Sequence, residues 1–119
     1  MGKSKPKSPT AQALAELRAD GYEVGVVERR LPIPGLWVTQ DLFGIIDLVA
    51  MKPGEPLLAV QVTSRSNINA RITKALAGGK AKTWVSTGNK FEIVGFGGKK
   101  TSKRTVVMGL DGLFVEKGR

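Results

Sequence analysis

The sequence of 119 residues contains neither cysteine nor histidine. The absence of cysteine excludes disulfide bonds, thiolate zinc sites and cysteine nucleophiles, and the absence of histidine excludes imidazole as a general base or metal ligand. A metal site in this chain must therefore use oxygen ligands, which favours Mg²⁺ or Mn²⁺ over zinc. No apolar run approaches the roughly 18 residues that a membrane span needs. We therefore expect a soluble, cytoplasmic protein with no membrane partner.

Acidic residues are scarce in one part of the chain. Residues 65–104 carry ten basic residues and a single acid, Glu92, whereas residues 1–64 carry seven of each sign. Concentrated positive charge is typical of proteins that bind polyanions, because phosphates neutralised by Lys or Arg release their counterions. The alternative is a lysine-rich surface that only keeps the protein soluble. The basic side chains expected to contact DNA are Lys80, Lys82, Lys99, Lys100, Lys103 and Arg104.

The length allows one domain, and the 41% of hydrophobic residues can supply its core. Residues 1–9 combine Lys, Ser, Pro and Gly with almost no apolar side chain, which predicts a disordered basic arm before a single domain over 10–119.

Hydrophobic patterns predict an α/β fold whose core order is αβββαβ, followed by further strands. A helix capped by Thr10 is expected to end near Asp20, and a second helix is expected from Asn67 to Leu76 with Ile68, Ile72 and Leu76 on its buried face. The proline-rich segment 31–35 is expected to be a loop. The segment 80–88 is ambiguous between helix and strand. The expected strands cover residues 22–30, 43–51, 57–63, 91–95, 105–110 and 113–116.

Two polar residues interrupt the most apolar strands. Asp47 lies inside FGIIDLVAM and Gln61 lies inside LLAVQVT. A carboxylate on an interior strand is costly unless it is paired or binds a metal. Because alternate residues of a strand point the same way, Gln61 and Thr63 share a face, and Asp47 can reach that face across the turn. The other interpretation is a buried aspartate satisfied by an arginine or by backbone amides.

The element order and the strands IIDLVA and LLAVQVTS resemble the PD-(D/E)XK nuclease superfamily, the restriction-endonuclease-like fold that includes Holliday junction resolvases and VRR-NUC domains. The resemblance covers about residues 10–96. The sequence is also similar to small phage-type proteins with a W-x3-DLFG-x2-D, QVTS and R-x2-K pattern. The residues that carry this longer pattern are Trp37, Asp41 to Gly44, Asp47, Gln61 to Ser64, Arg71 and Lys74.

The resemblance implies a mixed central sheet flanked by helices and a Mg²⁺-dependent or Mn²⁺-dependent active site. Asp47 matches the family's aspartate, whereas Gln61 and Thr63 stand where Glu and Lys are usual. A cation on the next helix, Lys74 or Arg71, would replace the missing lysine. The metal ligands that the resemblance implies are Asp47, Gln61, the Val62 carbonyl group and Asp41, with Glu16 or Glu28 as an additional carboxylate.

The function that this resemblance implies is metal-dependent endonuclease hydrolysis of DNA, selective for junctions or flaps, in a bacterial, archaeal or phage-infected cell. A DNA-binding protein that keeps the fold without catalysis is the alternative, because both residues of Glu-x-Lys are replaced. A basic RNA-binding or ribosome-associated protein ranks third, since it does not need Asp47 opposite Gln61. Symmetric cutting of two strands needs two active sites, so we expect a homodimer.

Overall fold

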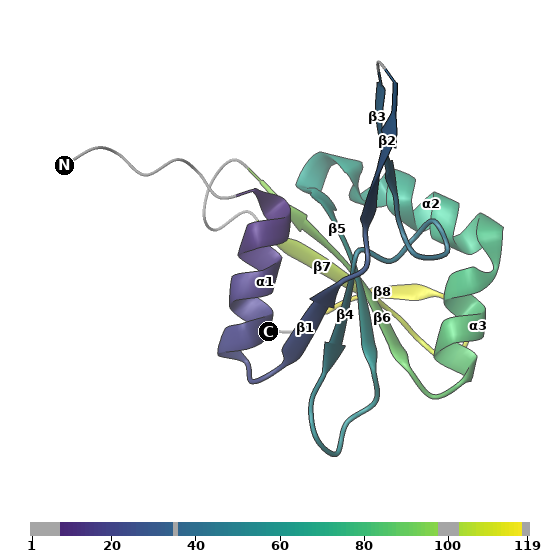
Figure 1. The fold of residues 1–119 in the computed structure, drawn as a ribbon. Coiled ribbons are helices and arrows are strands. Elements are labelled where there is room, and N and C mark those ends of the chain that lie inside the picture. The colour runs from purple at the N-terminus through teal and green to yellow at the C-terminus, as the bar shows by residue number, and fades with distance from the viewer. Residues whose placement is uncertain (1–7, 35, 98–102, 118–119) are drawn as a thin grey trace.

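The structure is a computed structural model that describes residues 8–34, 36–97 and 103–117. Helices and strands follow one another along the whole of this part of the chain (Figure 1). In chain order they are α1 (Pro9–Ala19), β1 (Glu23–Val26), β2 (Arg29–Ile33), β3 (Leu36–Gln40), β4 (Leu48–Met51), β5 (Leu58–Ser64), a 3-10 turn (Arg65–Asn67), α2 (Ile68–Gly78), α3 (Lys80–Ser86), β6 (Lys90–Phe96), β7 (Arg104–Met108) and β8 (Phe114–Glu116).

Six strands form one mixed sheet in the order β1-β4-β5-β6-β7-β8. Strands β5 and β6 are parallel, and every other neighbouring pair is antiparallel. Strands β2 and β3 form a separate two-stranded ribbon that projects away from the sheet (Figure 1). Apart from this ribbon, the chain order is α-β-β-β-α-α-β-β-β. The predicted α/β class is confirmed, and so is the antiparallel pairing of the strands that carry Asp47 and Gln61.

Apolar side chains cover both faces of the sheet. On one face Ile46, Phe91 and Ile93 form a core with Ile68 and Ala75 of α2. On the other face Leu48, Val60, Val94 and Phe96 pack with Ala13 of α1. The alternation of side chains along each strand sends neighbouring residues to opposite cores. Gln61 belongs to the α2 face by this alternation, because it lies between Val60 and Val62, which pack on the α1 side.

Gly95 fixes how closely α2 approaches the sheet. A Cβ atom at this position would lie 2.6 Å from the Ile68 side chain and 2.8 Å from the Arg65 Cα atom. The backbone where the 3-10 turn leads into α2 therefore rests directly on β6. This contact sets the position of α2 beside the end of β5.

The proline-rich segment is part of a ribbon and not the predicted loop. Arg29 pairs with Gln40 and Ile33 pairs with Leu36, with Pro32 opposite Trp37. Proline is tolerated here because a two-stranded ribbon has two edges and no central strand. The prediction of a loop was wrong because proline is excluded only from central strands, and the segment forms an edge strand. The predicted strand 43–51 is also shorter than expected, since β4 begins at Leu48 after a tight turn.

The predicted start of the first helix was wrong, whereas its predicted end near Asp20 is confirmed. Ser8 caps α1, with its hydroxyl oxygen accepting a hydrogen bond from the Ala11 amide at 3.2 Å, and Pro9 occupies the first turn. Proline suits that position because its missing N–H would have no partner there. The domain thus includes residues 8 and 9, and the rest of the predicted arm, residues 1–7, lies outside the described residues.

Two features of the region after β5 also differ from expectation. Leu76 is 48% exposed, and Ala75 takes its place on the buried face of α2 behind Ile68 and Ile72. A stripe at i, i+4 and i+7 follows the 3.6-residue helical repeat better than one at i, i+4 and i+8. The ambiguous segment 80–88 contains the helix α3.

Among the helices of the described residues, none has the length and apolar character that crossing a membrane requires.

Candidate metal centre

Asp47 lies where the chain enters β4, the strand between β1 and β5 in the sheet. Its backbone N–H donates to Val60 O at 3.0 Å, and its backbone oxygen accepts from the Val27 N–H at 2.9 Å. The side chain is only 5% exposed, and its Oδ2 atom accepts a hydrogen bond from the Val62 N–H at 2.7 Å. Asp47 is therefore held between β1 and β5 by its backbone and side chain together.

A tight turn brings Asp41 to Asp47. Leu42 and Ile46 exchange two backbone hydrogen bonds, Leu42 N–H to Ile46 O at 2.9 Å and Ile46 N–H to Leu42 O at 3.0 Å. The backbone is left-handed at Phe43, with φ of 55°, and at Gly44, with φ of 74°. The turn reverses the chain, so that the residue before it and the residue after it lie together.

Glu28 joins this pair from the start of the other ribbon strand, β2. It directly precedes Arg29, and Asp41 directly follows Gln40, so the two acids flank the Arg29 and Gln40 pair at the base of the ribbon. Carboxylate oxygen atoms of Glu28, Asp41 and Asp47 all lie within 4.8 Å of one another. The ribbon thus supplies two of the three acids, and β4 supplies the third.

Burial and, to a smaller extent, the two neighbouring acids raise the pKa of Asp47. Burial raises its pKa to about 7, and the hydrogen bond with Asp41 and the charges of Asp41 and Glu28 act in the same direction. The hydrogen bond from the Val62 N–H opposes these effects. Three carboxylates this close repel one another, and a divalent cation between them would relieve both the repulsion and the cost of burial.

Gln61 presents a buried amide beside these acids. Its side chain is 1% exposed, and neither Oε1 nor Nε2 has a hydrogen-bond partner among the described residues. A buried polar group without a partner costs on the order of 1–3 kcal/mol, so such groups commonly mark a ligand or an active site. The amide oxygen is a ligand type that hard cations accept.

The acids and Gln61 line one hollow of about 480 Å³. Thr63 and the backbone of Val62 contribute from β5, and Arg71 and Lys74 contribute from α2. Arg71 and Lys74 are three residues apart, which puts them on the same side of the helix. The structure therefore brings together Asp41, Asp47, Gln61, Val62, Thr63, Arg71, Lys74 and Glu28, all of them site residues predicted from the sequence.

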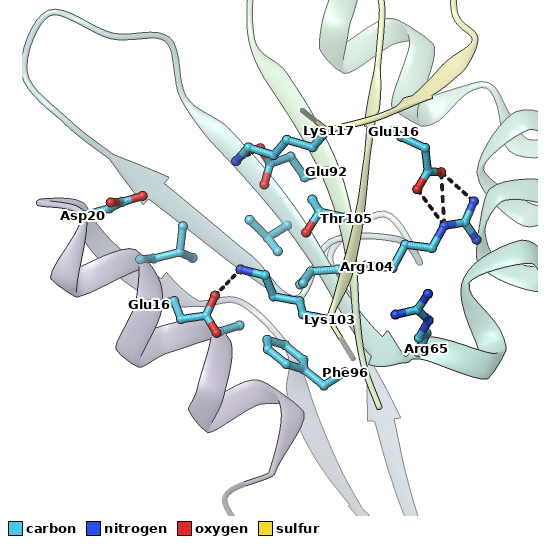
Figure 2. A pocket seen from close by; sticks show the side chains of 14 residues that line it. Glu16, Asp20, Arg65, Glu92, Phe96, Lys103, Arg104, Thr105, Glu116 and Lys117 are labelled. Carbon is cyan, nitrogen blue, oxygen red and sulfur yellow. Dashed lines mark hydrogen bonds and ion pairs between the residues drawn. The ribbon is translucent and has the colours of Figure 1, made fainter. Parts of the chain in front are cut away.

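Glu16 lies at a different place. It belongs to a second hollow of about 720 Å³ between α1 and the strands β5, β6 and β7. Figure 2 shows its carboxylate facing Lys103, with which it forms an ion pair. Of the two additional carboxylates that the sequence left open, Glu28 lies in the acidic cluster and Glu16 does not.

The basic residues predicted to contact DNA are distributed over several environments. Lys103 pairs with Glu16, and Arg104 makes a bidentate ion pair with Glu116, 2.6 Å at its shortest (Figure 2). Lys80 lies over the ring of Phe43, with 5.9 Å from Nζ to the ring centroid. Lys82 is exposed, and Lys99 and Lys100 lie outside the described residues.

Sequence reasoning missed Phe43. The residue was read only as part of a motif, yet it combines a left-handed backbone with a ring that is 55% exposed. The glycine that follows it was the available signal, since Gly44 between two apolar residues marks a turn and not the strand expected there.

Comparisons of this chain with protein-family models, with curated proteins and with solved structures found no match.

Proposed function

We propose that this protein is a metal-dependent DNA endonuclease that hydrolyses phosphodiester bonds. The observation that carries the proposal is the composition of the hollow around Asp47. Three clustered carboxylates and a buried amide without a partner lie beside two cationic side chains. Oxygen ligands next to Arg and Lys suit a metal ion and a phosphate group bound side by side.

The residues fit Mg²⁺ or Mn²⁺. The ligand atoms available are carboxylate oxygens of Asp47, Asp41 and Glu28 and the Oε1 atom of Gln61, and these hard cations prefer such oxygen ligands. The lack of a partner for Gln61 supports this assignment, because a metal ligand needs a lone pair that no protein donor has taken. When bound, such a cation stabilises the charge that develops on phosphate and lowers the pKa of a water molecule.

The protein's own residues have distinct roles in this proposal. Asp47 is fixed by the Val62 N–H, so its other carboxylate oxygen stays directed at the cluster. Arg71 and Lys74 neutralise the phosphate from the α2 side of the hollow, which is the task of the lysine that Thr63 replaces. Thr63 is 7% exposed and lines the hollow with a hydroxyl group, which can donate to a phosphate oxygen but carries no charge.

The fold supports the same proposal. Without the ribbon, the described chain runs α-β-β-β-α before its parallel strand β6, with Asp47 at the second strand of the main sheet and Gln61 in the third. This order agrees with a restriction-endonuclease-like αβββαβ core. Helix α3 is an addition between α2 and β6.

A cleavage assay tests the proposal. Labelled duplex, flap and four-way junction DNA are incubated with the protein and Mg²⁺, Mn²⁺ or EDTA. We expect cleavage of at least one substrate with a divalent metal and none with EDTA. Asp47→Asn should abolish the cleavage, whereas Glu16→Gln, which changes an acid outside the cluster, should leave it within about twofold.

A DNA-binding protein without catalysis is the second outcome of this assay. The departures at Gln61 and Thr63 favour it, because β5 carries neither the glutamate nor the lysine of the Glu-x-Lys pattern. DNA binding without cleavage under either metal would establish this alternative and overturn the nuclease proposal.

We also expect the active form to be a homodimer, which light scattering with and without DNA would test.

A further inference from the structure

Phe43 is an aromatic side chain that the fold holds outside the core. It lies at the tip of the turn between Leu42 and Ile46, and its ring is 55% exposed. The backbone adopts φ of 55° there, a conformation that costs free energy for a bulky residue with a Cβ atom. Gly44 shows that the same turn also uses a residue without this cost. Folding alone therefore does not explain an exposed phenylalanine at this position.

The same turn also holds the acidic cluster. Asp41 directly precedes it and Asp47 directly follows it, and the paired backbone hydrogen bonds between Leu42 and Ile46 tie the tip rigidly to both acids. Phe43 is thus fixed only two residues from a carboxylate of the candidate metal centre.

A lysine side chain lies directly against the ring. Lys80 lies over it at 5.9 Å, and Arg71 and Lys74 line the hollow on α2, the helix before Lys80. A ring next to a lysine offers a planar surface for a base together with a charge for the adjoining phosphate, the combination that proteins use to bind single-stranded nucleic acid.

We propose that Phe43 stacks on an unpaired nucleotide base beside the phosphate held at the metal centre, with Lys80 contacting the next phosphate. This inference rests on the proposed function for the class of its ligand, and it adds that the substrate carries unpaired bases at the cleavage site. Single-stranded DNA, a flap and a frayed junction meet this requirement, whereas the interior of an intact duplex does not.

Binding measured in EDTA tests the inference without requiring cleavage. The probes are fluorescein-labelled dT12 and a twelve-unit abasic oligonucleotide with the same sugar-phosphate backbone, followed by fluorescence anisotropy. Stacking predicts that Phe43→Ala weakens binding of dT12 by about 5- to 30-fold and leaves binding of the abasic strand unchanged. Phe43→Trp should bind dT12 at least as tightly as the wild type. Lys80→Ala should weaken the binding of both probes equally.

Two further variants control for folding and for exposed apolar area. Phe43→Leu keeps an apolar side chain at the same backbone position, and it should melt like the wild type while losing most of the preference for dT12. Leu110→Ala removes an apolar side chain that is 86% exposed on the turn before β8, and it should leave the affinity for both probes unchanged.

Equal binding of dT12 by the wild type and Phe43→Ala would overturn the inference, and so would an equal loss on both probes. The preference for dT12 can persist in a protein that never cleaves DNA, which would refute the nuclease proposal alone. Cleavage that survives in Phe43→Ala with unchanged dT12 binding would refute the stacking role alone.

Discussion

Two hollows among the described residues contain the same kinds of charged side chain in opposite arrangements. On the α1 face, acids and bases are paired, Glu16 with Lys103 and Glu92 with Lys117 at 2.8 Å (Figure 2). On the α2 face, Glu28, Asp41 and Asp47 crowd together instead. Paired surface charges satisfy each other, whereas clustered like charges call for a partner from outside. We therefore place the proposed function in the smaller hollow.

The largest expected effect comes from removing two cations from one hollow, in comparison with removing two cations from the other. The double variant Arg71→Ala/Lys74→Ala should lower the cleavage rate about 100-fold, because these cations face the phosphate in the proposed site. The matched variant Lys103→Ala/Arg104→Ala removes the same charge from residues that are ion-paired, and it should weaken DNA binding only about two- to fivefold. Cleavage rates and DNA affinities, measured for both double variants at one salt concentration, check these expectations. Equal losses of cleavage in the two variants would contradict the comparison.

Gln61→Met should stabilise the protein while impairing its metal site. The change replaces a buried amide that has no partner with an apolar side chain of similar shape, so the free energy of unfolding should rise by about 1–2 kcal/mol. The melting temperature should rise by about 4–10 °C. Gln40→Met, at an exposed amide, serves as the control with little change. A lower melting temperature for Gln61→Met would show that the amide is satisfied in solution.

The pH dependence of stability should reveal the raised pKa of Asp47. The folded protein keeps this proton up to a pH of about 7, whereas the unfolded chain releases it near its ordinary pKa of 3.8. The folded state therefore binds more protons between these values, and the free energy of unfolding falls as the pH rises through this window.

Asp47→Asn removes this titration while an amide oxygen can still accept from the Val62 N–H. In EDTA the variant should melt like the wild type near pH 4 and several degrees higher near pH 8. A variant that melts well below the wild type at every pH would instead assign Asp47 a structural role.

The smallest expected effect is the change in stability when an ion pair of the α1 hollow is broken. Glu16→Gln breaks an ion pair between two side chains that are each nearly half exposed. Such pairs contribute about 0–1 kcal/mol, so the melting temperature should move by no more than about 4 °C, and less still in high salt. A larger loss would mean that the α1 hollow depends on this pair for its structure.

The centre of the site was predictable from the sequence because it depends on local patterns. Asp47 and Gln61 stand out against apolar neighbours, and the short Pro-Gly turn between their strands predicts the antiparallel pairing that the structure has. Strand alternation then places Gln61 on the α2 face, because Val60 and Val62 pack on the α1 side. Arg71 and Lys74 follow from the helical repeat, since α2 begins directly after β5 and its 3-10 turn.

The rest depends on contacts between distant segments. Glu28 reaches the cluster only because residues 29–40 form a ribbon, and the prolines in that segment favoured a loop. The pairing of Lys103 with Glu16 joins residues 87 positions apart, so the block of basic residues could not show which of its charges are paired. Charge counts along a sequence therefore overstate the positive surface that remains available to DNA.

The most direct test of the central claim is calorimetric titration of the protein with Mn²⁺ near pH 8, in parallel with Asp47→Asn and Glu16→Gln. We expect one saturable site in the wild type and in Glu16→Gln, and its loss in Asp47→Asn, because Asp47 belongs to the acidic cluster and Glu16 does not. The account would be contradicted if the wild type bound no metal ion, or if Asp47→Asn bound it as tightly as the wild type does.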